Sequence, residues 1–215
     1  MKDKFSEAFM TPTSFNHRFL AGTAPKRHPL LLLHGTGGDE DDLIPVGQMI
    51  DPAAALLSPR GKVLENGMSR FFRRLTEGVF DYPDVIARTH ELADFVAAQT
   101  STHGLEKPIA VGYSNGANIA AALLYLRPEV LAGAVLIRAM LPLQTEPEHT
   151  LESMPVMIIS GRMDPILPLD NAKRLAEALR EHGAVIDHRV LETGHGMTRN
   201  DVDLARGFVA GMNGA

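Results

Sequence analysis

The chain has 215 residues, of which 45% are hydrophobic and 22% are charged, and its formal net charge is −5. This length suits one α/β domain with a full core, and the composition excludes a disordered or fibrous protein. The negative charge gives no electrostatic reason to bind nucleic acid, and the absence of cysteine excludes disulfides, cysteine–zinc sites and thiol catalysis.

The sequence indicates neither a targeting segment nor a membrane segment. The first ten residues contain Asp3, Lys4 and Glu7, so they cannot form the apolar core of a signal peptide. No apolar run approaches the roughly 20 residues that a helix needs to span a bilayer. We therefore expect a cytoplasmic protein that does not insert into a membrane.

Short apolar runs alternate with amphipathic stretches, which is typical of a mostly parallel sheet covered by helices on both faces. The pattern is compatible with an antiparallel strand over residues 14–21, and it predicts strands over residues 29–34, 53–58, 108–113, 131–137, 155–160 and 185–191. Apolar residues at helical spacing predict helices that begin near residue 81, at residue 117, at an Asp170 cap and near residue 202. Residues 138–153 are predicted to form a loop, too short for a large lid. The fold class is therefore α/β, as a single domain over residues 1–215.

The most specific motif is Gly112-Tyr113-Ser114-Asn115-Gly116, which follows a predicted strand and opens a predicted helix. A G-x-S-x-G sequence in this setting is typical of a sharp turn that exposes a nucleophilic serine. Side chains at the two flanking positions would collide with the strand and the helix, which explains Gly112 and Gly116. The alternative is a tight turn with an incidental serine. We take Ser114 as the expected nucleophile.

A serine nucleophile needs a base, and the base needs an acid that fixes its tautomer. In this kind of fold the order along the chain is serine, acid, histidine. His195 lies between two glycines in a loop after the last predicted strand, so it is the expected base. The other histidines after Ser114 suit a polar loop, a helix end and a strand; they are His149, His182 and His188.

The expected acid is Asp164, just past the end of the strand predicted over residues 155–160. Sites in open α/β sheets form at the carboxyl ends of the strands, which favours this position. The other aspartates have structural interpretations as a helix cap, a strand residue or first-turn residues; they are Asp170, Asp187, Asp201 and Asp203. The alternative for Asp164 is an ordinary turn before Pro165.

The segment His34-Gly35-Thr36-Gly37-Gly38 follows a predicted strand and is flexible enough to turn backbone N–H groups toward the serine. The N–H groups of Thr36 and Asn115 are the expected donors to the oxyanion that forms during acyl transfer. His34 precedes the serine in the chain, so a hydrogen bond that braces the loop suits it better than a catalytic role. The segment lacks the lysine and the spacing of a phosphate-binding loop.

The acidic run over residues 39–42 is expected to favour the N-terminus of a helix that starts there. A metal site is the alternative, but no His/Asp spacing elsewhere completes it, and we expect no metal and no cofactor. A substrate pocket is expected to involve Phe71, Arg74, Met140, Leu141 and Ile166. For residues 70–74, the default interpretation is that the phenylalanines pack in the core and the arginines are solvated or ion-paired. The alternative is that one arginine binds a polar or anionic substrate.

The strand-HGTGG opening and the segments GYSNGAN, SGRMDPILP and TGHGM resemble the phospholipase/carboxylesterase branch of the α/β hydrolases. The segments LSPRGKVLENG, RFFRR and EGVFD resemble, more specifically, small bacterial carboxylesterases linked to hydroquinone and quinone detoxification. The resemblance covers residues 30–208 and implies Ser114, Asp164 and His195 as a catalytic triad, with Thr36 and Asn115 as oxyanion donors. Acyl-protein thioesterases usually carry glutamine where this chain has Asn115, which disfavours protein deacylation.

The sequence therefore predicts a serine hydrolase that cleaves a carboxylic ester of a small molecule through an acyl-enzyme intermediate. Acyl-protein thioesterase or lysophospholipase-like activity remains an alternative, and so does a non-catalytic small-molecule receptor on the same fold. The expected partner is the ester substrate alone. Neither nucleic acid nor a membrane is expected, and a homodimer is compatible with the sequence.

Overall fold

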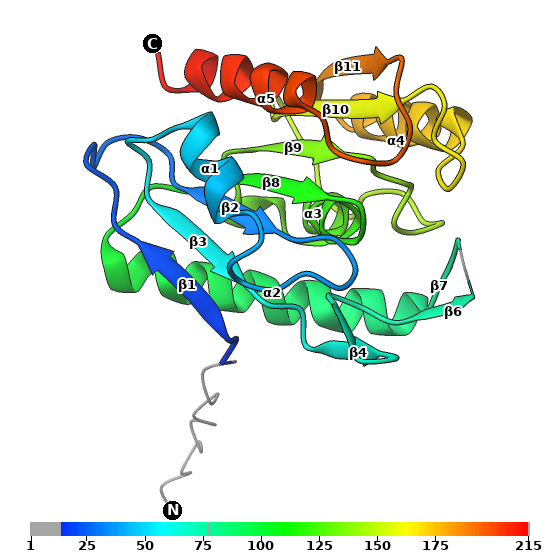
Figure 1. The fold of residues 1–215 in the computed structure, drawn as a ribbon, viewed down its shortest axis with the longest axis horizontal. Coiled ribbons are helices and arrows are strands. Elements are labelled where there is room, and N and C mark those ends of the chain that lie inside the picture. The colour runs from blue at the N-terminus through cyan, green and yellow to red at the C-terminus, as the bar shows by residue number, and fades with distance from the viewer. Residues whose placement is uncertain (1–13, 77, 215) are drawn as a thin grey trace, which may run out of the picture.

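The computed structural model describes residues 14–76 and 78–214. Its centre is a seven-stranded sheet with the order β1-β3-β2-β8-β9-β10-β11 (Figure 1). These strands are β1 (His17–Leu20), β2 (Leu30–Leu33), β3 (Leu56–Pro59), β8 (Ile109–Tyr113), β9 (Gly133–Ile137), β10 (Pro155–Gly161) and β11 (Val185–Leu191). Strand β1 is antiparallel to β3, and every other neighbouring pair is parallel.

Helices cover both faces of the sheet. They are α1 (Ile44–Ile50), α2 (Tyr82–His103), α3 (Asn115–Leu126), α4 (Leu169–Glu181) and α5 (Arg199–Met212), with a short 3₁₀ turn at Pro128–Val130. Helices α2, α3 and α4 pack into one hydrophobic core, and α1 and α5 pack into the other (Figure 1). In the described part of the chain, no helix is both long enough and apolar enough to cross a membrane.

The side chains of strand β2 point alternately into the two hydrophobic cores. All four of its leucines are fully buried, as expected of a central parallel strand with helices on both faces. Leu31 and Leu33 belong to the core under α2, α3 and α4, whereas Leu30 and Leu32 belong to the core under α1 and α5. The alternation follows from the period of two in an extended chain.

The six strands predicted for the parallel part of the sheet are all present, and their boundaries shift by up to three residues. The antiparallel strand at the N-terminal end is also present, as β1. The structure adds two hairpins that the sequence did not indicate, formed by β4 (Val63–Glu65) with β5 (Met68–Arg70) and by β6 (Arg74–Thr76) with β7 (Val79–Phe80). These hairpins lie near the N-terminal end of α2 (Figure 1).

Two expectations about helix ends were wrong. Pro168 precedes the first residue of α4, so Asp170 lies inside the first turn, where its side chain binds Lys173 instead of capping the helix. Helix α1 begins only at Ile44, with no acidic residue in its first turn. The preceding carboxylates form ion pairs instead, Asp41 with Arg18 at 2.6 Å and Glu40 with Arg60.

A buried ion pair joins Arg138, the residue directly after β9, to Asp201 in α5. The Arg138 guanidinium donates to both carboxylate oxygens of Asp201, at 2.8 and 3.1 Å, and both side chains are 0% exposed. The Asp201 carboxylate also accepts hydrogen bonds from the backbone N–H and hydroxyl of Thr198, in a capping box at the start of α5. Removing one member of such a pair leaves the other charge buried without its partner, which is strongly destabilising.

We predict that Arg138→Met lowers the free energy of unfolding by about 3–5 kcal/mol. Urea unfolding monitored by circular dichroism measures the change. Arg189→Met is the matched control, because Arg189 pairs with Asp187 on the surface, and its loss should cost less than about 1 kcal/mol. Equal effects of the two substitutions would contradict a special role for the buried pair.

Candidate active site

Ser114 occupies a strained turn between β8 and α3. Its backbone has φ 53° and ψ −113°, a conformation that residues with side chains rarely adopt and that costs on the order of 1–3 kcal/mol. A Cβ atom at Gly112 would lie 2.5 Å from the carbonyl oxygen of Gly116, and one at Gly116 would lie 1.9 Å from that of Leu33. The predicted need for glycine at both positions is therefore confirmed.

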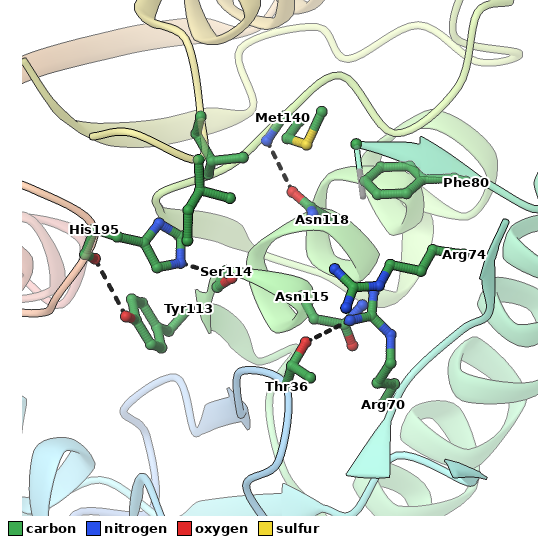
Figure 2. A pocket seen from close by; sticks show the side chains of 13 residues that line it. Thr36, Arg70, Arg74, Phe80, Tyr113, Ser114, Asn115, Asn118, Met140 and His195 are labelled. Atoms are coloured by element: carbon green, nitrogen blue, oxygen red, sulfur yellow. Dashed lines mark hydrogen bonds between the residues drawn. The ribbon is translucent and has the colours of Figure 1, made fainter. Parts of the chain in front are cut away.

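A continuous chain of hydrogen bonds links Ser114, His195 and Asp164. Nε2 of His195 lies 3.0 Å from Oγ of Ser114, and Nδ1 lies 2.8 Å from Oδ2 of Asp164. Figure 2 shows the imidazole turned toward the serine hydroxyl at the edge of a pocket. The Asp164 side chain is 1% exposed and that of His195 is 19% exposed, so the carboxylate is screened from water while the imidazole stays accessible.

The second oxygen of Asp164 is also held in place. Its Oδ1 accepts hydrogen bonds from the backbone N–H groups of Ile166 and Leu167, at 2.9 and 3.1 Å. These donors fix the carboxylate so that Oδ2 faces the imidazole. Two of the other histidines that follow the serine bind elsewhere: His182 contacts the carbonyl oxygen of Ala178, and His188 contacts the Ser160 hydroxyl.

The loop that carries His195 is tied to the sheet by two side chains that the sequence analysis did not identify. Arg138 donates to the carbonyl oxygens of Gly194 and Gly196, at 3.0 and 3.2 Å. The Tyr113 hydroxyl donates to the carbonyl oxygen of His195 at 3.2 Å (Figure 2). Burial raises the pKa of Tyr113, which keeps the hydroxyl protonated and able to donate.

The loop after β2 lies on the other side of the serine. Its N–H groups at Gly37 and Gly38 are used within the protein, bonded to the carbonyl oxygens of Ser69 and Gly35. By contrast, the N–H groups of Thr36 and Asn115 make no hydrogen bond to any residue in the described ranges, and both residues line the pocket. They are therefore available to a ligand oxygen beside Ser114.

His34 braces this loop, as the sequence indicated. Its Nδ1 donates to the carbonyl oxygen of Gly35 at 2.7 Å, and its Nε2 accepts from the N–H of Gly61 at 3.0 Å. Burial lowers the pKa of His34, which favours the neutral ring that this donor and acceptor pattern requires. The histidine thus connects the loop after β2 to the chain that leads into the β4–β5 hairpin.

The pocket beside Ser114 has a volume of about 350 Å³. It is lined by Thr36, Arg70, Arg74, Gly78, Phe80, Tyr113, Ser114, Asn115, Asn118, Met140, Ile166, Leu167 and His195. Arg74, Met140 and Ile166 were predicted pocket residues and do line it. Within residues 14–76 and 78–214, no group of three or more histidine and acidic side chains could hold a metal ion.

Two of the predicted pocket residues do not line the pocket. Phe71 is 3% exposed, and its ring packs against that of His34 with the centroids 4.7 Å apart. The backbone N–H of Leu141 donates to Oδ1 of Asn171 at 2.6 Å, and its side chain packs against the core under α2, α3 and α4. In both cases the pocket wall comes from the adjacent residue, Arg70 in place of Phe71 and Met140 in place of Leu141.

The three arginines of the RFFRR segment have different surroundings. Arg73 is exposed and pairs with Asp81 at 2.9 Å, as the default interpretation expected. Arg70 and Arg74 instead line the pocket, and both contact Glu65, at 3.2 and 2.9 Å. Arg70 is 3% exposed, and its pKa is lowered first by burial and then by the charge of Arg74.

Comparisons with known proteins place this fold and pocket in a family. The model of the phospholipase/carboxylesterase family matches residues 80–213. MhqD of Bacillus subtilis strain 168, a protein named as a hydrolase, is 46% identical over 192 residues, which are 88% of this chain and 95% of MhqD.

Two solved structures are similar over almost the whole chain. A carboxylesterase from Bacillus cereus is 40% identical with a TM-score of 0.89, and the match covers 92% of this chain and 94% of that one. A carboxylesterase from Mesorhizobium loti is 33% identical with a TM-score of 0.86, covering 92% and 95%. This chain therefore belongs to the phospholipase/carboxylesterase family and is a carboxylesterase-type hydrolase with the α/β-hydrolase fold.

Proposed function

We propose that the protein hydrolyses a carboxylic ester of a small molecule by two-step acyl transfer, with Ser114 as the nucleophile. The observation that carries this proposal is the hydrogen-bonded series from Asp164 Oδ2 through His195 to Ser114 Oγ, at 2.8 and 3.0 Å. A serine hydroxyl is a weak nucleophile until a base removes its proton, and this arrangement provides a base and an acid that orients it.

In the first step, His195 Nε2 accepts the proton of Ser114 Oγ while Oγ forms a bond to the ester carbonyl carbon. The Asp164 carboxylate stabilises the imidazolium that results, because it accepts a hydrogen bond from Nδ1. The N–H groups of Thr36 and Asn115 donate to the negatively charged oxygen of the tetrahedral intermediate. The C–O bond to the alcohol then breaks, and the alcohol leaves with the proton from His195.

In the second step, His195 removes a proton from water as the water oxygen attacks the acyl-serine carbonyl. The same two N–H groups stabilise the second tetrahedral intermediate. Its collapse releases the carboxylic acid and returns the proton to Ser114 Oγ. Each step leaves His195 neutral again, so the loop that carries it has to keep the ring in reach of both Ser114 and Asp164 throughout.

Two alternatives follow from the same fold. Thioesters and lysophospholipids undergo the same acyl transfer, so thioesterase or lysophospholipase-like activity would use the same residues. The pocket of about 350 Å³ favours a small ester over a protein or lipid substrate. A non-catalytic receptor would bind a small molecule without turnover, and it would give no reason for the strained turn at Ser114.

We predict that Ser114→Ala lowers kcat for p-nitrophenyl acetate by about 10⁴-fold or more, since no acyl-enzyme can form. A serine-directed fluorophosphonate probe should label the wild-type protein and not the variant. Ser160→Ala is the matched control, because Ser160 also contacts a histidine, His188, at 2.9 Å, and it should retain turnover. Undiminished turnover in Ser114→Ala would reject the assignment, and ligand binding without any turnover in the wild type would favour the receptor.

We also predict that Asp164→Asn lowers kcat by about 10³–10⁴-fold, because an amide at this position favours the wrong imidazole tautomer. The KM for the same ester should change little, since Asp164 is buried and does not line the pocket. Steady-state kinetics separates the two constants. Asp170→Asn makes the same chemical change at an exposed aspartate of α4 and should leave both constants unchanged; a similar loss there would refute the role given to Asp164.

A further inference from the structure

One side of the pocket is lined by hydrogen-bond donors. Arg70 and Arg74 come from the β4–β5 and β6–β7 hairpins, Thr36 from the loop after β2 and Asn115 from the start of α3. We call these four residues the donor corner. Figure 2 shows the two guanidinium groups together on the side of the pocket away from His195, with Thr36 and Asn115 next to them.

Among the residues that the structure describes, only one carboxylate pairs with the two arginines. Nε of Arg74 binds Glu65 at 2.9 Å, and its two terminal nitrogens make no hydrogen bond to a residue in the described ranges. Arg70 also contacts Glu65, at 3.2 Å, and donates to Oγ1 of Thr36 at 2.6 Å. Two positive charges thus share one carboxylate here, and the described pocket lining contains no aspartate or glutamate.

The neighbouring polar groups add donors rather than acceptors. Thr36 Oγ1 accepts a hydrogen bond from Arg70, which leaves the hydroxyl proton free to donate. Asn115 Oδ1 accepts from the backbone N–H of Phe71 at 2.8 Å, and this bond fixes the amide nitrogen on the other side. That nitrogen is buried without a hydrogen-bond partner among the described residues, although an unpaired buried donor is destabilising.

We propose that the donor corner binds a carboxylate or a similar anionic group of the substrate, so that the enzyme prefers esters that carry a negative charge. This inference rests on the proposed function, because it places the anion in the same pocket as the scissile bond. Guanidinium groups match carboxylates in geometry, and a charge-assisted hydrogen bond in a half-enclosed pocket is stronger than one in water. An uncharged ester would leave the excess positive charge of the two arginines without a partner.

The alternative is a purely structural role, in which Arg74 forms an ion pair with Glu65 and so stabilises the hairpins. That role needs only Nε of Arg74, so it does not explain why the two terminal nitrogens face the pocket. It predicts that removing the Arg74 charge changes stability and not substrate preference. The two interpretations therefore differ in a quantity that can be measured.

The test compares pairs of esters in which a carboxylate of one member is replaced by its neutral methyl ester in the other. In the first pair, 4-acetoxybenzoate carries a carboxylate on the leaving group, and methyl 4-acetoxybenzoate is its neutral counterpart. In the second, 4-nitrophenyl hydrogen adipate carries it on the acyl group, and 4-nitrophenyl methyl adipate does not. The ratio of kcat/KM, anionic over neutral, is measured for each variant on the same pair, so that differences in intrinsic reactivity cancel.

Arg74→Gln is expected to lower this ratio at least about tenfold in one or both pairs, as for the loss of a charge-assisted hydrogen bond. Arg74→Lys keeps the charge and should retain part of the preference. Arg73→Gln is the matched control, because Arg73 is exposed and pairs with Asp81 outside the pocket, and its ratio should equal that of the wild type. A ratio that Arg74→Gln leaves unchanged in both pairs overturns the proposal.

A binding measurement separates this inference from the proposed catalysis. Calorimetry with 4-hydroxybenzoate on the Ser114→Ala protein should give a Kd that rises when Arg74→Gln is added, whereas the weaker binding of methyl 4-hydroxybenzoate should not change. If the wild type hydrolyses none of the esters and yet shows this binding difference, the catalytic proposal fails and the anion site stands. Equal effects of Arg74→Gln on both ligands overturn the anion site.

Discussion

The backbone turn at Ser114 is the constraint on which the arrangement of the site depends. It forms only because Gly112 and Gly116 bring β2, β8 and α3 closer together than any side chain would allow. The turn projects the serine side chain at the carboxyl edge of the sheet, where neighbouring strands end. The loop after β2, the aspartate after β10 and the histidine after β11 reach the serine because parallel strands deliver their ends to one edge.

The parts of the site that the sequence predicts are those that follow a strand directly. Ser114, Asp164 and His195 each lie within a few residues of the end of a predicted strand, so their meeting at one edge follows from the alternation of strands and helices. Their geometry agrees with that expectation, with distances of 2.8 and 3.0 Å along the series. The loop-bracing role of His34 could also be predicted from the sequence. His34 precedes Ser114 in the chain, which disfavours it as a catalytic base in this kind of fold.

The pocket wall could not be predicted in the same way, because it depends on pairing between segments without a strong pattern. Each strand of the β4–β5 and β6–β7 hairpins has only two or three residues, which is too short for an alternation of apolar and polar residues to be recognised. Their register decides that Arg70 and Arg74 face the pocket while Arg73 faces solvent, and that Phe71 enters the core. The role of Arg138 could not be predicted either, since the loop residues and the aspartate that it binds lie 56 to 63 residues further along the chain.

The link between Arg138 and the first turn of α5 has a consequence for local unfolding. Arg138 holds Asp201 and two carbonyl oxygens of the loop around His195, so the position of the imidazole depends on contacts that α5 completes. Because α5 follows every strand of the sheet in the chain, these contacts are complete only once α5 has packed onto the sheet. Local unfolding of α5 alone would therefore remove the carboxylate that orients the Arg138 guanidinium toward the loop around His195.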